Sequence, residues 1–396
     1  MKYSLLKHIL EEPNLSILEL SEVLLISESK LFRKIKELNI LLKEFGLTIK
    51  NTQILGNEEQ IRYLYYSIFS LFHPSERPDY LNLNERNQYF VNRLEESLRL
   101  KFNSSTRDKI SCWIGISDKR RKIGDFKIDF LLRQKKIYQD DHLYQLLDSL
   151  FYQVVYANQD KNNCETILFY GFFVSFYILD KESYYKYDIF RSKKIPAVML
   201  NIRIREKLLN FYRHYRLAID EEKSLQYQLS QINNKFYFFT GTLSNFQQKD
   251  LLFRQSQLME ESVTDLLAQL CNEAEVDFQK GKLAKTSLDE LMFGYGNAIL
   301  LLEMIFAPNI TILYDLSETP LYQIPLEQFI KNHLRGIENI KIEPYQEDIT
   351  YDLLITSKRN DERKAMYYLS EVATNYDIIR ISQKIESLKQ EKASLY

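Results

Sequence analysis

The chain has 396 residues, 45% hydrophobic and 27% charged, with a formal net charge of −1 at pH 7. The length excludes a single small module and predicts about two to four domains with cores of their own. The balanced charge excludes a protein that is basic overall, so any contact with nucleic acid must come from a local patch.

Cysteine usage and the apolar segments place the chain in a broad class. Cys112, Cys164 and Cys271 lie far apart without a CxxC spacing, which favours buried thiols in a reducing compartment over disulfides or a zinc site. The N-terminal segment carries acidic residues where a signal peptide needs an apolar run, and the most apolar stretch, residues 167–179, is too short to cross a bilayer. Glycine and proline are scarce, which favours long helices. We therefore expect a cytoplasmic, mostly α-helical protein without a membrane contact.

Three helices are predicted at the N-terminus. The first covers residues 3–11. Ser16 and Glu19 form an S-x-x-E capping box that starts the second helix, and Ser27 is the N-cap candidate of the third, which covers residues 28–45. A short turn between the second and third helices is typical of a helix-turn-helix.

The third helix has an apolar side and a polar side. The apolar side is a stripe of residues that recur at steps of three and four: Leu31, Ile35, Leu38, Leu42 and Phe45. At about 100° per residue, the side chains that point away from this stripe are those of Ser29, Lys30, Arg33, Lys36 and Glu37, with Lys34 on the flank. A helix that projects short polar and basic side chains is suited to a major groove.

A hairpin is predicted directly after the third helix. Gly46 ends the helix, residues 47–50 and 53–55 alternate as short strands, and Asn51-Thr52 makes the turn. This hairpin reads as the wing of a winged helix-turn-helix, where Lys50 can neutralise a phosphate.

Together these elements predict a DNA-binding site. The candidate DNA-binding residues are Ser27, Ser29, Lys30, Arg33, Lys34, Lys36 and Lys50. The simpler interpretation is the solvated face of an ordinary amphipathic helix, and the acidic side chains of Glu19, Glu22, Glu28 and Glu37 argue for it because they weaken the local field.

Residues 3–69 resemble the Mga-type helix-turn-helix of the Mga/AtxA virulence regulators of Gram-positive bacteria, in the segment "LSILELSEVLLISESKLFRKIKELNILLKEFGLTIKNTQILGNEEQIRYLYYSIF". The resemblance implies a cytoplasmic transcription regulator with winged units, two helical phosphotransferase-regulation domains, and a domain similar to enzyme IIB of the sugar phosphotransferase system. Family members carry another winged unit ahead of this one, so we expect either a short form or one DNA-binding unit per protomer.

The domain boundaries that we predict are placed at proline-containing breaks in the helical pattern and follow the domain order that the resemblance implies. They are a winged helix-turn-helix at 1–74, a first helical regulation domain at 75–190, a second at 191–307, and an enzyme IIB-like α/β domain at 308–396. The helical part contains the densest basic stretch, residues 118–136, which we interpret as a solvated loop and helix face, with an auxiliary phosphate contact as the alternative. Inside a helical pattern, the GxG of "FGYGN" (residues 293–297) follows no strand and is not taken as a phosphate loop.

Phosphorylation at histidine is what the resemblance implies for control. Of the five histidines, His142 in the first helical block and His214 in the second are the regulatory candidates, although neither falls at a position that aligns with the family's regulatory sites. Each is otherwise a solvated side chain on a polar helix face.

The C-terminal segment alternates strands and helices. Residues 309–316, 339–345 and 351–357 read as strands, and the last helix carries Ile378, Ile381, Ile385 and Leu388 on one side. The loop after the first strand has Asp315, Ser317 and Glu318 but no cysteine, so a phosphotransferase nucleophile is not expected there.

No phosphate loop, HExxH or GxSxG motif is present, and we expect no enzyme, cofactor or metal site. The function hypothesis is a DNA-binding transcription regulator of the Mga/AtxA type, controlled by the sugar phosphotransferase system. Its expected partners are double-stranded promoter DNA, a second or further copy of the chain, and phosphocarrier proteins. The alternative is a regulatory or oligomerisation protein that lacks autonomous DNA binding because the first winged unit is missing.

Overall fold

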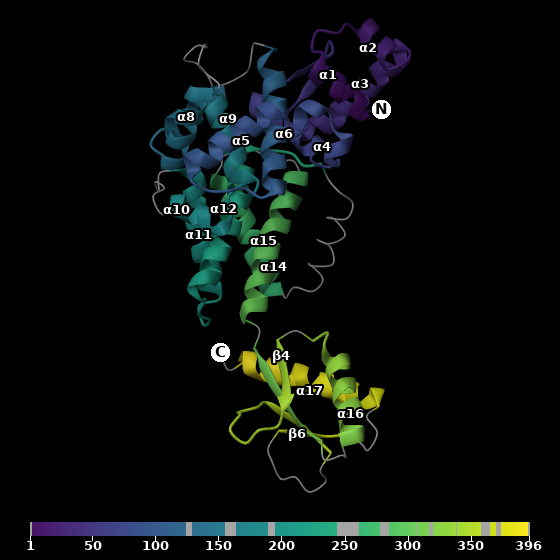
Figure 1. The fold of residues 1–396 in the computed structure, drawn as a ribbon, viewed down its shortest axis with the longest axis vertical. Helices are drawn as coiled ribbons and strands as arrows, with labels where there is room; N and C mark the ends of the chain where they lie inside the picture. Colours follow the sequence, from purple (N-terminus) through teal and green to yellow (C-terminus); the bar gives the residue numbers. More distant parts are fainter. Residues whose placement is uncertain are drawn as a thin grey trace. The chain divides into compact units, whose positions relative to one another are not determined.

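The computed structural model describes residues 2–123, 129–154, 164–188, 195–243, 261–277, 285–306, 308–316, 320–337, 339–357, 365–369 and 374–394. The chain divides into two compact units, the first made of residues 1–213 and 217–299 and the second of residues 214–216 and 300–396. Helices make up most of the described residues, with one small hairpin and one small sheet (Figure 1). The expected mostly α architecture with several folded parts is confirmed at this level.

The N-terminal part of the first unit has the predicted order of helices and strands. Its elements are α1 (Lys2–Glu11), α2 (Ile17–Val23), α3 (Glu28–Leu42), the 3-10 helix η1 (Lys43–Phe45), β1 (Thr48–Lys50), β2 (Gln53–Leu55) and α4 (Glu58–Phe69). The capping box is confirmed, since the Glu19 amide donates to Ser16 Oγ at 3.2 Å and the Ser16 amide donates to the Glu19 carboxylate at 2.7 Å. This pairing defines where α2 begins, and therefore where the turn before α3 lies.

The helices that follow form one continuous core with the N-terminal part. They are η2 (Pro74–Glu76), η3 (Asp79–Leu81), α5 (Glu85–Leu98), α6 (Ser104–Arg121), α7 (Asp129–Tyr138), α8 (His142–Val154), α9 (Glu165–Ser175) and α10 (Lys181–Asp188). Helix α9 contains most of the apolar stretch at residues 167–179, and every residue of α9 is buried. Trp113 of α6 stacks on Phe172 of α9 with ring centroids 4.5 Å apart, and Tyr66 of α4 meets both rings edge-on. Aromatic packing therefore joins α4 to the helical core.

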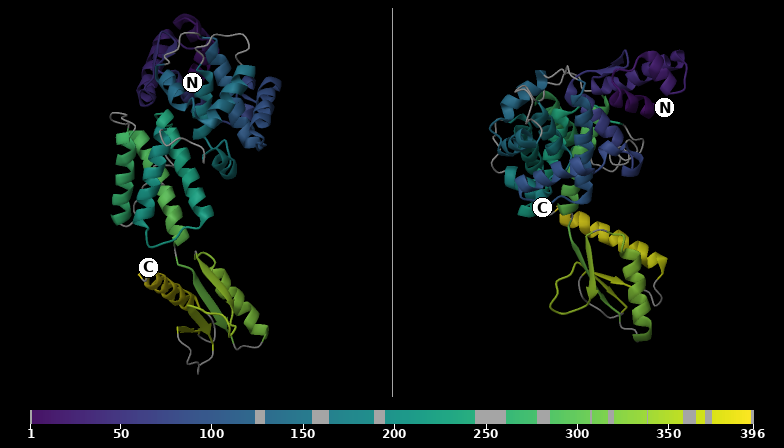
Figure 2. Two further views of the ribbon diagram at one scale, coloured as in Figure 1. Left: turned by 90° about the vertical axis from the view of Figure 1, so that its left-hand side faces the viewer. Right: turned by 45° about the horizontal axis from the view of Figure 1, so that its top comes forward.

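Four more helices complete the described part of the first unit. They are α11 (Pro196–Phe211), α12 (Ile219–Phe238), α14 (Glu261–Asp277) and α15 (Lys285–Phe306), of which the last continues into the second unit. Helix α12 packs against α9, α10 and α11, and α11 packs against α14 (Figure 2). A buried polar chain crosses this bundle: the Tyr295 hydroxyl donates to Asn233 Oδ1, and Asn233 Nδ2 donates to Asn201 Oδ1, both at 2.6 Å.

The second unit contains a parallel sheet with strand order β4-β3-β5-β6. Its elements are β3 (Ile310–Asp315), α16 (Pro320–Leu334), β4 (Ile340–Pro344), β5 (Leu353–Thr356), β6 (Met366–Tyr368) and α17 (Asn375–Ser394). The expected strands and the terminal helix are confirmed, and Ile378, Ile381 and Ile385 of α17 pack into the core of this unit. Strand β6 was not predicted. Of the loop after β3, Asp315 is described and partly buried, whereas Ser317 and Glu318 lie outside the described residues.

No helix in the described ranges is long and apolar enough to cross a membrane.

Candidate nucleic-acid interface

Helix α3 is the element that carries the predicted DNA-binding residues, and local interactions define both of its ends. The Ser27 hydroxyl accepts a hydrogen bond from the Lys30 amide at 3.4 Å, so Ser27 is the N-cap, as predicted. At the other end, Gly46 takes a left-handed conformation with φ 67° after η1. The stripe is buried as predicted, with Ile35 partly buried, and it packs α3 on α2 and β1.

The side of α3 opposite the stripe faces solvent. Ser29, Lys30, Arg33 and Lys36 are all exposed, as the helical periodicity predicts. Among the described residues, no carboxylate forms an ion pair with Lys30, Arg33 or Lys36. Three cationic side chains on one helix face are therefore available to an anionic partner.

Lys34 differs from the other basic residues of α3. Its Nζ lies 2.8 Å from Glu37 Oε2, and only 23% of its side chain is exposed. The hydrogen bond from Lys34 lowers the pKa of the Glu37 carboxyl, and Lys2, at 3.9 Å, adds to the same effect. Glu37 thus neutralises the charge of Lys34 locally, and it lies partly buried on the flank, not outward as predicted.

The wing follows α3 as an antiparallel hairpin. Thr48 pairs with Leu55, and Lys50 pairs with Gln53. Both turn residues, Asn51 and Thr52, have positive φ angles of 49° and 64°, as a type I′ turn requires. The Thr52 hydroxyl donates to the carbonyl oxygen of Leu15 at 2.5 Å, which holds the tip of the hairpin against the loop before α2. The Lys50 side chain remains exposed.

Asn39 connects α3 to the wing, and the periodicity did not identify it. Its Nδ2 donates to the Ile49 carbonyl oxygen at 3.0 Å, and the Ile49 amide donates to its Oδ1 at 2.6 Å. One side chain therefore satisfies both backbone groups of the central residue of β1. An asparagine in the middle of a helix is unfavourable for helix propensity, and this cost is the signal that points to a specific role.

The exposed side of α3 also carries apolar side chains that the sequence reading left out. Phe32, Ile40 and Leu41 are 54%, 66% and 49% exposed. Ile40 and Leu41 lie in the C-terminal half of the helix, beyond Arg33 and Lys36. The face is therefore basic towards its N-terminal half and apolar towards its C-terminal half.

Helix α4 attaches the winged unit to the helical core through a buried ionic network. Arg62 donates from both terminal nitrogens to the Glu165 carboxylate at 2.6 Å and from Nε to Glu58 at 2.8 Å. Glu58 in turn accepts from Arg120 at 2.7 and 3.1 Å. The four side chains are at most 8% exposed and carry two positive and two negative charges. Such a balanced, bidentate arrangement tolerates burial, whereas an unpaired charge does not.

This network corrects part of the interpretation of residues 118–136. Arg120 is buried against Glu58 instead of lying on a solvated face, because α6 packs directly on α4. Arg121 pairs with Asp118 on its own helix. Residues 124–128 of this stretch lie outside the described residues.

A second contact links α4 and η1 to the segment after α12. Gln60 Nε2 donates to the Phe238 carbonyl oxygen at 3.0 Å, and the Tyr63 hydroxyl donates to the Gly241 carbonyl oxygen at 2.9 Å. Gly241 has a positive φ of 86°, and a Cβ atom there would lie 2.9 Å from the backbone of Glu44. This segment therefore lies directly against the C-terminal end of α3 and η1.

The histidine candidates and the cysteines belong to parts of the chain other than α3. His142 is exposed at the first position of α8, with its ring centroid 6.2 Å from that of Tyr187, and His214 is exposed after α11. The three cysteines are buried and not in disulfides, as predicted, and burial raises the pKa of the Cys112 thiol to about 12. Within the described ranges, no group of three or more His, Cys, Asp or Glu side chains is arranged to hold a metal ion.

Comparison with known proteins identifies the N-terminal part. Residues 1–69 match the sequence model of the Mga helix-turn-helix domain, which belongs to transcription regulators. A search of curated protein sequences gives no match. The matched residues comprise α1 to α4 and the wing, so the resemblance noted in the sequence is confirmed for this part of the chain.

Proposed function

We propose that this protein is a sequence-specific DNA-binding transcription regulator in which α3 enters the major groove. The observation that carries the proposal is the exposed face of Lys30, Arg33 and Lys36, free of ion pairs with the described residues, on a helix held between a capped turn and a tethered wing. The match of residues 1–69 to a helix-turn-helix domain supports it.

The position of each side chain suggests its role. Ser29, Lys30 and Arg33 lie in the N-terminal half of α3, which in helix-turn-helix proteins contacts base edges, and an arginine can bind guanine with two hydrogen bonds. Lys36 and Lys50 are suited to the phosphate backbone. Ser27 caps α3, and the amide groups beside it can add a phosphate contact. Lys34 contributes least because Glu37 already pairs with it.

The test is a double substitution, Arg33→Ala with Lys36→Ala. The probe is a fluorescent duplex that the unaltered chain selects from a random library, and the readout is anisotropy at several salt concentrations. We expect the affinity to fall because both contacts are lost. The slope of log K against log salt should decrease by about 1, since the lost phosphate contact of Lys36 removes about 0.9. If no duplex is selected, the proposed function fails.

Helix α7 offers a matched control. Arg133 and Lys136 are both exposed and have the same residue types and spacing as Arg33 and Lys36. Arg133→Ala with Lys136→Ala should leave DNA binding unchanged. An equal loss of DNA affinity in both double variants would show that the DNA is attracted to positive charge without specificity, and it would reject the assignment of α3. That result would favour the auxiliary phosphate contact on residues 118–136.

The remaining predicted parts complete the proposal. We propose that the helices after α4 are the two regulation domains, that the parallel α/β unit is the enzyme IIB-like domain, and that the protein acts as a cytoplasmic dimer or larger assembly. Phosphocarrier proteins of the phosphotransferase system would modify His142 or His214, both of which are exposed. Phosphate transfer to the chain but not to a His142→Ala, His214→Ala variant is the expected result.

A second candidate function is a regulatory or oligomerisation protein that does not bind DNA autonomously. Exposed Phe32, Ile40 and Leu41 favour it, because clustered apolar side chains on one helix suit a protein partner. Light scattering separates the two functions. An assembly that dissociates when Ile40 and Leu41 are changed to serine, in a chain that selects no duplex, would favour the second.

A further inference from the structure

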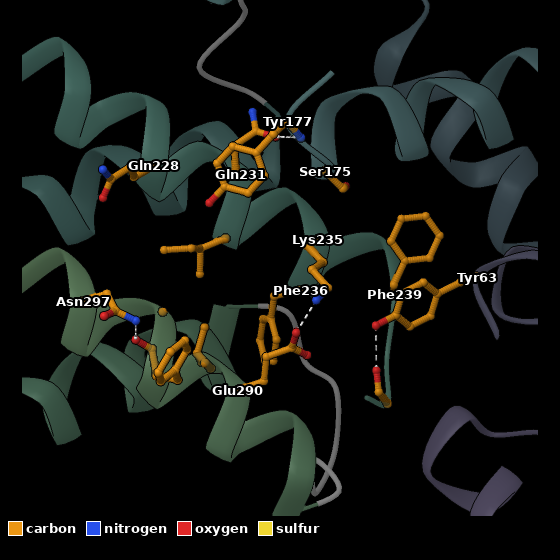
Figure 3. A pocket seen from close by; sticks show the side chains of 15 residues that line it. Tyr63, Ser175, Tyr177, Gln228, Gln231, Lys235, Phe236, Phe239, Glu290 and Asn297 are labelled. Carbon is orange, nitrogen blue, oxygen red and sulfur yellow. Dashed lines mark hydrogen bonds and ion pairs between the residues drawn. The ribbon is translucent and has the colours of Figure 1, made fainter. Parts of the chain in front are cut away.

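The first unit contains a cavity of about 260 Å³ between α4, the end of α9, α12 and α15 (Figure 3). This volume has room for several water molecules. It is smaller than most pockets for drug-sized ligands and suits a metabolite of amino-acid size. The GxG segment of residues 293–297 lies here on α15, where Phe293, Gly294 and Asn297 line the cavity wall.

Opposite charges and aromatic rings line the same cavity. Lys235 of α12 forms an ion pair with Glu290 of α15, as the dashed line in Figure 3 shows, and their side chains are 29% and 30% exposed. A ligand can therefore reach the pair from solvent. Tyr177, Phe236 and Phe293 supply apolar surface around it. Burial alone would lower the pKa of Lys235, but the nearby Tyr63 and Glu290 raise it above its usual value, so the ammonium stays charged.

The ion pair restricts which ligands fit. A ligand with one charge that separates Lys235 from Glu290 would pair with one of them and leave the other partly buried charge unpaired, which is costly. A zwitterion pairs with both, because its carboxylate can bind the Lys235 ammonium and its own ammonium can bind the Glu290 carboxylate. The aromatic wall then accommodates an apolar body.

We propose that this cavity is an effector site for a small zwitterionic metabolite with an apolar body, such as an apolar α-amino acid, and that its occupancy alters DNA binding. Tyr63, Phe239 and Gly241 line the cavity, and Gly241 lies against Glu44 at the end of the recognition helix. A ligand that shifts or holds this segment therefore acts on the winged unit. The effect on DNA rests on the proposed function, whereas ligand binding does not.

The ligand class is tested by calorimetry on the full chain. L-Phenylalanine and L-leucine are titrated beside phenethylamine, which lacks the carboxylate, and 3-phenylpropionate, which lacks the ammonium. We expect at least one of the two amino acids to bind. The two single-charge analogues should bind at least about tenfold more weakly, because each lacks one charge-assisted hydrogen bond to the ion pair. No binding of either amino acid, or equal binding of the analogues, overturns the proposal.

Substitution locates the site. Glu290→Gln keeps the shape of the side chain and should weaken amino-acid binding by about tenfold or more. Glu273→Gln is the control, since Glu273 pairs with Lys207 between α11 and α14, away from the cavity, and it should leave binding unchanged. Equal effects of the two substitutions overturn the assignment to this cavity. The analogue series uses the unaltered chain, so it decides the ligand class even if the variant does not fold.

The coupling is measured separately. Saturating amino acid should change the affinity for the selected duplex by about fivefold or more, the lower end of typical allosteric coupling. Binding of the amino acid with unchanged DNA affinity overturns the coupling. If the chain binds no DNA under any condition, the proposed function fails, and the calorimetry still decides whether the cavity is a ligand site.

Discussion

Removing one carboxylate from the buried network tests how α4 is held. Glu165→Gln preserves the size of the side chain but removes the carboxylate that accepts from both terminal nitrogens of Arg62, whose side chain is 0% exposed. The four-residue cluster then changes from neutral to a net charge of +1. Deleting one partner of a buried ion pair costs about 3–5 kcal/mol, and the glutamine oxygen can still accept one hydrogen bond, so we expect a loss of about 3 kcal/mol.

A single tryptophan makes this loss measurable. Trp113 is the chain's only tryptophan, and it is buried 5.8 Å from the ring of Tyr66 on α4. Its fluorescence during urea unfolding reports on the first unit, and the shift in midpoint gives the change in free energy of unfolding. Glu96→Gln breaks the exposed pair with Arg93 and should cost less than about 1 kcal/mol.

A Glu165→Gln variant that loses no more stability than Glu96→Gln would show that this network does not hold α4 in place. A double variant, Arg62→Met with Glu165→Met, adds a further check, because it leaves Glu58 and Arg120 as a balanced pair. It should be more stable than Glu165→Gln alone, since apolar replacement of a whole buried pair is often close to neutral.

Three further predictions concern single positions. Asn39→Ala leaves both backbone groups of Ile49 without their side-chain partner. It should lower the free energy of unfolding by about 1–3 kcal/mol in the same urea titration. No change would show that other contacts hold the wing. Gly241→Ala places a Cβ atom 2.9 Å from the Glu44 backbone, at a residue with a positive φ. The strain should lower the stability of the fold by about 1–3 kcal/mol and therefore lower the thermal midpoint of unfolding. An unchanged midpoint would refute the close contact. For Glu95, burial acts to raise the pKa, but hydrogen bonds from neighbouring basic side chains and a backbone amide outweigh it and lower the pKa below 4.5. The ionised Glu95 carboxylate therefore stabilises the fold above pH 4.5, and this stabilisation is lost as the pH falls through the lower pKa of the folded state. The Glu95→Gln variant should be less stable than the unaltered chain at pH 7, and its free energy of unfolding should fall less steeply between neutral and acidic pH. Parallel pH profiles of the two proteins would contradict this expectation.

Local patterns predicted most of the N-terminal elements. The capping box, the apolar stripe and the turn at Asn51-Thr52 depend on residues within a few positions of one another, so a reading of periodicity and turn chemistry finds them. Strand β6 (Met366–Tyr368) was missed because its sequence Met-Tyr-Tyr has no alternation of apolar and polar residues, and no turn like the one between β1 and β2 lies beside it in the described residues.

The contacts that organise the site depend on residues far apart in the sequence. Arg62 and Glu165 are 103 positions apart, and Gln60 and Phe238 are 178 apart. Nothing near Arg120 in the sequence distinguishes it from the solvated basic residues beside it, and only the packing of α6 on α4 reveals its role. The cavity is likewise formed by helices whose adjacency no periodicity indicates.

Because α4 is buried along nearly its whole length, it is shared between the winged unit and the helical core. The orientation of α3 therefore depends on the packing of residues inside the helical core. Under the proposed function, a genetic screen for loss of promoter activity should find substitutions at buried positions of α9 as well as on α3. Second-site suppressors of such defects should appear on α4 or α6.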